Sequence, residues 1–220
     1  EAIEPALDAS LKRLGMDHVD VYLLHGVGVG SYDHAAAVWV SELRRLKTSG
    51  KVRAIGVTEG FEGDRGHAML QRAVADGWPD VVMVGFNILN SSARERVLKT
   101  TREKWIGTLV MFAVRRAFSR PEKLKQILDD LRARGRLGPG LDEGDAPLGF
   151  LLGAGGAASL TDAAYRFCRH EPGVSSVLFG TGDQAHLEAN VRSLEAPPLP
   201  RAVLDRLTSA FGAVDDVSGQ

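Results

Sequence analysis

The first residue with an evident capacity for chemistry is His25, which ends the apolar segment Val19-Asp20-Val21-Tyr22-Leu23-Leu24-His25. An imidazole gains or loses a proton near neutral pH, so it can act in general acid–base catalysis. The apolar run predicts a strand buried on both faces over residues 19–24. Because parallel α/β proteins carry their chemistry at the carboxyl ends of strands, we interpret His25 as a candidate catalytic residue rather than a structural histidine.

A second feature is the turn Gly180-Thr181-Gly182-Asp183, which follows an apolar segment and precedes a helical one. Backbone N–H groups and the amino end of a helix converge at such a turn, and together they favour a bound phosphate. Asp183 is expected to be the N-cap of that helix, where its carboxylate accepts the free N–H groups and repels an additional phosphate.

Short β-rich runs alternate with helical ones, which predicts an α/β protein with a parallel sheet. We predict strands over residues 19–24, 52–57, 81–84, 108–111 and 176–179. Helices are predicted over residues 4–15, 35–48, 66–76, 93–100, 120–134, 159–170 and 184–194. A closed (β/α) barrel has eight strands, so about five strands with surrounding helices predict a partial TIM barrel.

The chain has 220 residues, 44% of them hydrophobic, which suffices for one sizeable core. A net charge of −1 gives no reason to expect nucleic acid or a membrane surface as partner. We expect one domain over residues 1–213 with a glycine-rich loop at residues 137–156, followed by a frayed tail over residues 214–220. The single cysteine, Cys168, is expected to be inert in the core, which suits a cytoplasmic protein.

The amino-terminal residues carry a family resemblance. Ser10-Leu11-Lys12-Arg13-Leu14-Gly15, followed by Asp20-Val21-Tyr22-Leu23-Leu24-His25, resembles the helix–strand signature of the aldo-keto reductases. The resemblance implies an oxidoreductase that reduces aldehydes or ketones with NAD(P)H, in which His25 belongs to an Asp/Tyr/Lys/His tetrad. It also implies that the amino-terminal βα units are missing. We therefore expect a missing barrel segment in cis or from another chain, and negligible turnover by this chain alone.

The same resemblance assigns cofactor contacts near the nicotinamide. Residues 55–61 resemble a strand ending in Ser and Asn, which bind the carboxamide; Thr58 keeps the hydroxyl, whereas Glu59 replaces the amide with an anion. Residues 81–87 resemble the next strand, in which Asn87 matches and Met83 replaces a glutamine. Phe112 matches an aromatic residue that stacks on the nicotinamide ring.

Further contacts are implied along the rest of the cofactor. Arg115 or Arg116 would approach the pyrophosphate, or both are solvated loop arginines. Gly180, Thr181, Gly182 and Asp183 would hold the adenosine phosphate, and Asn190 matches an asparagine that contacts adenine. No Arg or Lys lies between Gly180 and Asn190, so the cofactor is NADP or NAD with NADH weakly preferred. No residues are assigned to a metal.

Three alternatives remain open. Gly26-Val27-Gly28-Val29-Gly30 approaches a dinucleotide-binding fingerprint, with Ser31 where the third glycine belongs and Glu59 as the ribose-binding acid. The altered residues Glu59 and Met83 favour a non-catalytic NAD(P)-binding relative acting as a sensor or scaffold. An unrelated barrel lyase or isomerase is the third.

Overall fold

The computed structural model describes residues 3–142, 144, 146–153 and 156–220. Residues 1 and 2, and residues 143, 145, 154 and 155 of the predicted loop over 137–156, lie outside the described residues. The described residues form one parallel sheet of five strands: β1 (Val19–Val27), β2 (Val52–Glu59), β3 (Val81–Gly85), β4 (Gly107–Met111) and β5 (Ser176–Val177). The prediction of an α/β fold with about five parallel strands is confirmed.

The connecting helices are α1 (Ile3–Leu14), α2 (Tyr32–Thr48), α3 (Ala68–Asp76), α4 (Lys99–Glu103), α5 (Arg116–Ser119), α6 (Pro121–Ala133), α7 (Leu160–Arg169), α8 (Gln184–Glu195) and α9 (Arg201–Phe211). A π-helical turn, Arg94–Leu98, precedes α4, and short 3₁₀ turns lie at Val29–Ser31 and Gly149–Leu151. Helix α1 illustrates why these segments form: Ile3, Leu7 and Leu11 recur on one face and are all buried.

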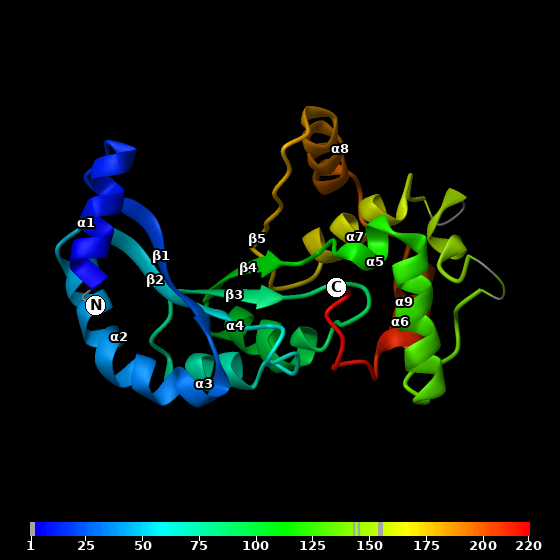
Figure 1. Cartoon of the computed structure of the whole chain (residues 1–220), viewed down its shortest axis with the longest axis horizontal. Helices are drawn as coiled ribbons and strands as arrows, with labels where there is room; N and C mark the ends of the chain where they lie inside the picture. Colours follow the sequence, from blue (N-terminus) through cyan, green and yellow to red (C-terminus); the bar gives the residue numbers. More distant parts are fainter. Residues whose placement is uncertain (1–2, 143, 145, 154–155) are drawn as a thin grey trace.

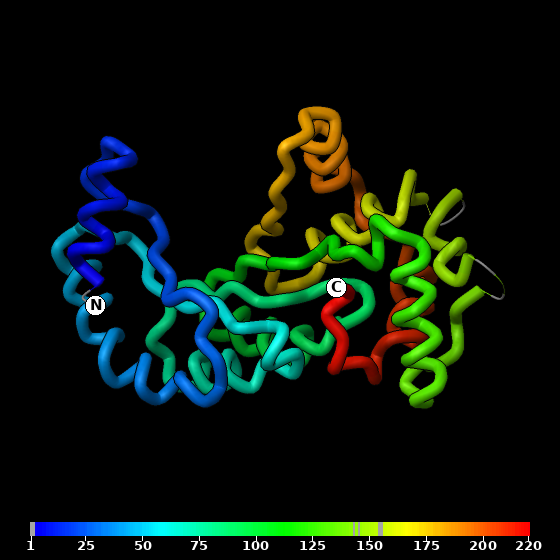
Figure 2. The backbone as a smooth tube through the Cα atoms, in the orientation of Figure 1, coloured from blue at the N-terminus to red at the C-terminus, as the bar shows by residue number. Residues whose placement is uncertain are grey.

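The strands follow one another across the sheet in the order β1-β2-β3-β4-β5. The colours of Figures 1 and 2 therefore change steadily from one edge of the sheet to the other. A dinucleotide-binding sheet of the doubly wound type reverses its order at a switch point, and this sheet does not. Gly28, moreover, precedes a 3₁₀ turn and donates its N–H to Ser31 Oγ at 3.1 Å. The Rossmann alternative is therefore wrong.

The strand that carries His25 is longer than predicted. Pairing with β2 continues from Leu24↔Val57 to Val27↔Glu59, with an irregularity between Leu24 and Val27. Gly26 sits there with φ of 62°, a left-handed conformation that glycine adopts without steric cost. Within the described part of the chain, β1 and β5 each pair with one neighbour, so the sheet is open.

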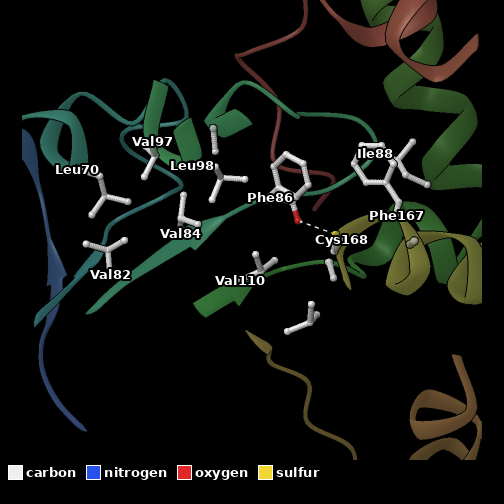
Figure 3. Packing of buried hydrophobic residues seen from close by; sticks show 14 of the residues in the cluster. Leu70, Val82, Val84, Phe86, Ile88, Val97, Leu98, Val110, Phe167 and Cys168 are labelled. Carbon is white, nitrogen blue, oxygen red and sulfur yellow. Dashed lines mark hydrogen bonds between the residues drawn. The ribbon is translucent and has the colours of Figure 1, made fainter. Parts of the chain in front are cut away.

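The core lies between the sheet and its helices, and Figure 3 shows part of it around β3 and α7. Phe86 and Phe167 stack with ring centroids 5.3 Å apart. Cys168 is fully buried, and its Sγ donates to the Phe86 carbonyl at 3.3 Å. Burial raises the pKa of the Cys168 thiol well above its usual value, so this residue is a packing residue and not a nucleophile.

The prediction of a frayed tail over residues 214–220 is wrong. Carbonyl oxygens of four successive residues accept hydrogen bonds from the rest of the protein: Asp216 from Arg65, Val217 from Asn90, Ser218 from Asn87 and Gly219 from Ala117. The tail ends beyond the carboxyl end of β3, where Figure 1 marks the C-terminus. Local sequence patterns do not predict these hydrogen bonds, because each one joins the tail to a residue more than 90 positions away.

Candidate cofactor site

A cleft of about 650 Å³ opens beside the carboxyl ends of β4 and β5. Its lining residues come from β4 and the segment after it, from α7, and from the loop and helix after β5: Met111, Phe112, Ala113, Val114, Ser119, Ser159, Thr161, Tyr165, Leu178, Phe179, Gly180, Thr181, His186, Ala189 and Asn190. The structure thus brings together four of the predicted cofactor residues, Phe112, Gly180, Thr181 and Asn190.

The turn after β5 is built as its sequence predicts. Asp183 is the N-cap of α8, and its Oδ1 accepts the His186 N–H at 2.8 Å. This hydrogen bond lowers the pKa of the Asp183 carboxyl, so the group stays negatively charged at neutral pH. Thr181 Oγ1 accepts the Asp183 N–H at 3.1 Å. Gly182 and Asp183 are exposed and continue the turn beyond the residues that line the cleft.

Two polar side chains of the cleft are nearly buried and make no side-chain hydrogen bond within the described residues. Asn190 is 9% exposed and lies on α8, and Tyr165 is 5% exposed and lies on α7. Buried polar groups are normally hydrogen-bonded, so both side chains are suited to a ligand in the cleft. Sequence reasoning missed Tyr165; the signal was a hydroxyl-bearing residue within the otherwise apolar run Ala163-Ala164-Tyr165.

His25 is exposed at the irregular end of β1, and it is not among the residues that line the cleft. Thr58 on β2 fixes this strand end, because its Oγ1 accepts the Gly26 N–H at 2.6 Å. Thr58 is 4% exposed, so its hydroxyl is largely enclosed. Its observed contact positions the residue next to His25; the predicted cofactor contact of Thr58 stays a prediction.

Glu59 ends β2 and turns into the protein. Its carboxylate contacts His67 Nδ1 at 3.0 Å and accepts the Gly85 N–H at 2.7 Å, and both side chains of the Glu59–His67 pair are fully buried. Burial is the main reason that the pKa of Glu59 lies above its usual value. His67 Nε2 lies 3.1 Å from Ser92 Oγ. The Glu59 carboxylate is therefore engaged in contacts inside the protein.

Asn87 has a structural role in the described residues. It is fully buried, and its Oδ1 accepts the N–H groups of Leu89 and Asn90, each at 3.0 Å. Its Nδ2 donates to the Ser218 carbonyl at 3.2 Å and to the Phe112 carbonyl at 3.4 Å. These four contacts use the donors and acceptors of the amide, which leaves little capacity for the predicted contact with a cofactor.

Phe112 has a left-handed backbone with φ of 68°, which is rare for a residue with a side chain. Its ring stacks with Phe61 at 5.9 Å, and the Arg115 guanidinium carbon lies 4.0 Å from the ring centroid. Arg115 is also paired with Glu62. Arg115 therefore packs on Phe112 and is engaged with a carboxylate, while Arg116 is exposed at the start of α5.

Neither a metal centre nor a membrane span is found in the described part of the chain. There, no group of three or more His, Cys, Asp or Glu side chains could hold a metal ion. The described helices also include none that is long and apolar enough to cross a bilayer.

These features define the class of protein. A model of the Aldo/keto reductase family matches residues 1–211, so the chain belongs to this family. Members of the family generally use NAD(P)H and are oxidoreductases.

Among curated proteins, the chain is similar to the NADH-specific methylglyoxal reductase of Escherichia coli, with 32% identity over 106 residues. It is likewise similar to the L-galactose dehydrogenase of Arabidopsis thaliana, with 32% identity over 110 residues. These matches cover 48% and 50% of this chain, and 31% and 34% of the two relatives. The matched region thus spans about a third of the length of each relative.

Among solved structures, the holo form of aldo-keto reductase AKR11C1 from Bacillus halodurans superimposes with a TM-score of 0.71. The match covers 99% of this chain and 67% of that chain at 21% sequence identity. The apo form of the same protein gives a TM-score of 0.68 at 22% identity. These matches show that the fold is that of the TIM-barrel aldo-keto reductases.

Proposed function

We propose that this chain supplies the adenosine-binding part of an NAD(P)H-dependent oxidoreductase that reduces small aldehydes or ketones. The observation that carries the proposal is the cleft beside β4 and β5, which is lined by Gly180, Thr181 and the nearly buried Asn190. The amide of Asn190 has no side-chain partner in the described residues, and adenine offers both a donor and acceptors. Gly182 and Asp183 would complete the turn around the phosphate.

The cofactor, when bound, supplies a hydride to the carbonyl carbon. The role proposed for this chain's own residues is to hold the adenosine half and to place a titratable group near the carbonyl. His25 is the group proposed to orient the carbonyl oxygen, because it is exposed at a strand end that the Thr58–Gly26 hydrogen bond fixes. Phe112 is proposed to present its ring to the nicotinamide, with Arg115 packed against it.

Asp183 supports a preference for NADH. Its carboxylate already occupies the amino end of α8, and the cleft lining in the described residues includes no Lys or Arg. A 2′-phosphate at this point would meet a like charge without a cationic partner, so NADH should bind at least as tightly as NADPH. The E. coli relative is named as NADH-specific, which agrees with this preference.

A second candidate function is nucleotide binding without turnover, as in a sensor or scaffold. Two observations favour it: Glu59 is tied to His67 and Gly85, and the Asn87 amide is engaged with backbone groups. On the nicotinamide side, Glu59 and the Asn87 amide are thus engaged within the protein, whereas the Asn190 side chain on the proposed adenosine side makes no hydrogen bond to the described residues.

The edges of the sheet bear on the partners of the chain. Val21 on β1 is 40% exposed and Leu178 after β5 is 39% exposed, at the two edges that have one neighbour each within the described residues. Unpaired edges with apolar side chains favour further β-structure. We propose that a βα segment of the same polypeptide or of another chain covers them, and that the assembled protein works in the cytoplasm.

The test combines binding with turnover. Titration with NADH and NADPH should give a saturable signal with NADH at least as tight; a tenfold tighter constant for NADPH would contradict the cofactor assignment. Carbonyl-dependent loss of NADH absorbance, with methylglyoxal and simple aldehydes as probes, distinguishes the two functions. In an active protein, His25→Ala should lower kcat and leave NADH affinity unchanged, because its interaction strengthens in the transition state. Saturable binding of NADH without turnover of any carbonyl probe would favour the sensor or scaffold.

A further inference from the structure

Tyr165 lies on α7, and its ring forms part of the wall of the cleft. The residue is 5% exposed, and its ring meets that of Phe179 edge to face, with centroids 5.9 Å apart and planes at 68°. The ring is therefore held by packing against Phe179, and this packing fixes the direction of the hydroxyl.

The hydroxyl of Tyr165 makes no hydrogen bond to the described residues. It is also not one of the enclosed, unpartnered side-chain atoms, which are Arg65 Nε, Arg115 Nε, Arg136 Nε and Asp216 Oδ1. Tyr165 lines the cleft and its hydroxyl is neither paired nor enclosed by the described residues, so a ligand in the cleft can reach this hydroxyl. A hydroxyl held in the wall of a cleft by a packed ring is a fixed hydrogen-bonding group for a ligand that displaces water from the cleft.

The chemistry of the cleft indicates what kind of ligand this is. Its polar lining residues are neutral hydrogen-bonding groups together with one histidine: Ser119, Ser159, Thr161, Tyr165, Thr181, His186 and Asn190. Burial raises the pKa of Tyr165, so the hydroxyl remains protonated and can donate throughout the neutral range. Because the cleft lining in the described residues includes no Lys or Arg, this neutral donor suits a ribose oxygen or a ring nitrogen better than a phosphate.

We propose that the Tyr165 hydroxyl donates a hydrogen bond to a neutral acceptor of the adenosine half of the nicotinamide dinucleotide and so determines affinity for it. The assignment rests on the proposed function, since it requires the dinucleotide to occupy this cleft. It adds to that function a residue of α7, a helix that comes before β5 in the chain and from which the sequence predicted no cofactor contact.

The experiment is a calorimetric titration of the 220-residue chain and of Tyr165→Phe with ADP-ribose, which is the dinucleotide without its nicotinamide ring and keeps the whole adenosine half, and with nicotinamide mononucleotide. The substitution removes one hydroxyl and keeps the ring. Loss of one neutral hydrogen bond should weaken ADP-ribose binding about three- to tenfold and leave nicotinamide mononucleotide unaffected. Tyr22→Phe is the matched control, because Tyr22 lies on β1 outside the cleft.

Thermal unfolding without ligand provides a second readout. Because the hydroxyl has no partner in the described residues, the Tm of unliganded Tyr165→Phe should equal that of the wild type, while its rise with ADP-ribose should be smaller. Equal affinity of wild type and Tyr165→Phe for ADP-ribose would overturn this assignment and leave the proposed function intact. A lowered Tm without ligand would assign the hydroxyl to the fold instead. If the folded wild type does not bind ADP-ribose at all, the proposed function fails and this assignment fails with it.

Discussion

Asn87 and Asn190 have the same side chain, and both were predicted to contact the cofactor, yet the structure gives them different surroundings. Asn87 is fully buried and makes three hydrogen bonds of 3.0 to 3.2 Å and a fourth of 3.4 Å. Asn190 is nearly as buried but makes no side-chain hydrogen bond in the described part of the chain. We predict that Asn87→Ala destabilises the fold, and that Asn190→Ala weakens nucleotide binding.

The magnitude for Asn87→Ala follows from its partners. Each hydrogen bond contributes about 1 kcal/mol net, and the buried backbone groups that lose a partner add to the cost. The four contacts of Asn87 thus give a loss of about 3–4 kcal/mol in unfolding free energy. At this chain length 1 kcal/mol corresponds to about 2–4 °C, so the Tm should fall by roughly 10 °C.

The assay is urea unfolding of both variants, paired with an ADP-ribose titration. Asn190→Ala should stay within about 1 kcal/mol of the wild type, and its affinity for ADP-ribose should fall severalfold. Equal losses of stability in the two variants would refute the separation of roles. So would a stable Asn87→Ala variant whose only defect is nucleotide binding, because the Asn87 amide would then be free for the cofactor.

The remaining predictions concern charge. Glu59→Gln should remove one component of the pH dependence of the unfolding free energy. Since burial raises the pKa of Glu59, the contribution of Glu59 to the stability of the wild type declines as the pH rises through that raised pKa. Urea unfolding of wild type and variant from pH 4 to 8 should therefore show a difference in unfolding free energy that changes with pH. A constant difference would show that Glu59 does not titrate there. Asp215, whose carboxylate pairs with Arg96 at 2.7 Å and Arg136 at 2.5 Å, has its pKa lowered, first by the hydrogen bond from Arg96. Asp215→Asn should therefore cost up to about 1 kcal/mol at neutral pH, a loss that vanishes as pH falls through the lowered pKa; Asp20→Asn, in an exposed pair with Arg53, is the matched control. An equal cost in both variants would mean that Asp215 does not anchor the tail.

The fold could be predicted in outline because its signals are local. Apolar runs between turn residues located all five strands, and the helix faces followed from residues three and four positions apart, as in α1. The N-cap at Asp183 was also predictable, since a capping side chain acts on backbone groups within three residues of itself.

The partners of the site residues could not be predicted, because long-range geometry decides them. The Asn87 amide is used by Ser218, 131 positions away, and Glu59 is used by His67 and Gly85. The tail was mistaken for a frayed end for the same reason, since it lacks a periodic pattern of its own and is held by groups of other segments. Tyr165 was overlooked because only the three-dimensional structure shows that it lies in the wall of the cleft.

The most direct test of the central claim is amide hydrogen exchange of the 220-residue chain with and without ADP-ribose. The claim is that the cleft between the segment after β4, helix α7 and helix α8 holds the adenosine half of the cofactor. It predicts slower exchange on binding at residues 178–190 and at Tyr165, with little change at residues 26–31. Protection confined to residues 26–31, or binding that leaves the 178–190 segment unchanged, would contradict the account.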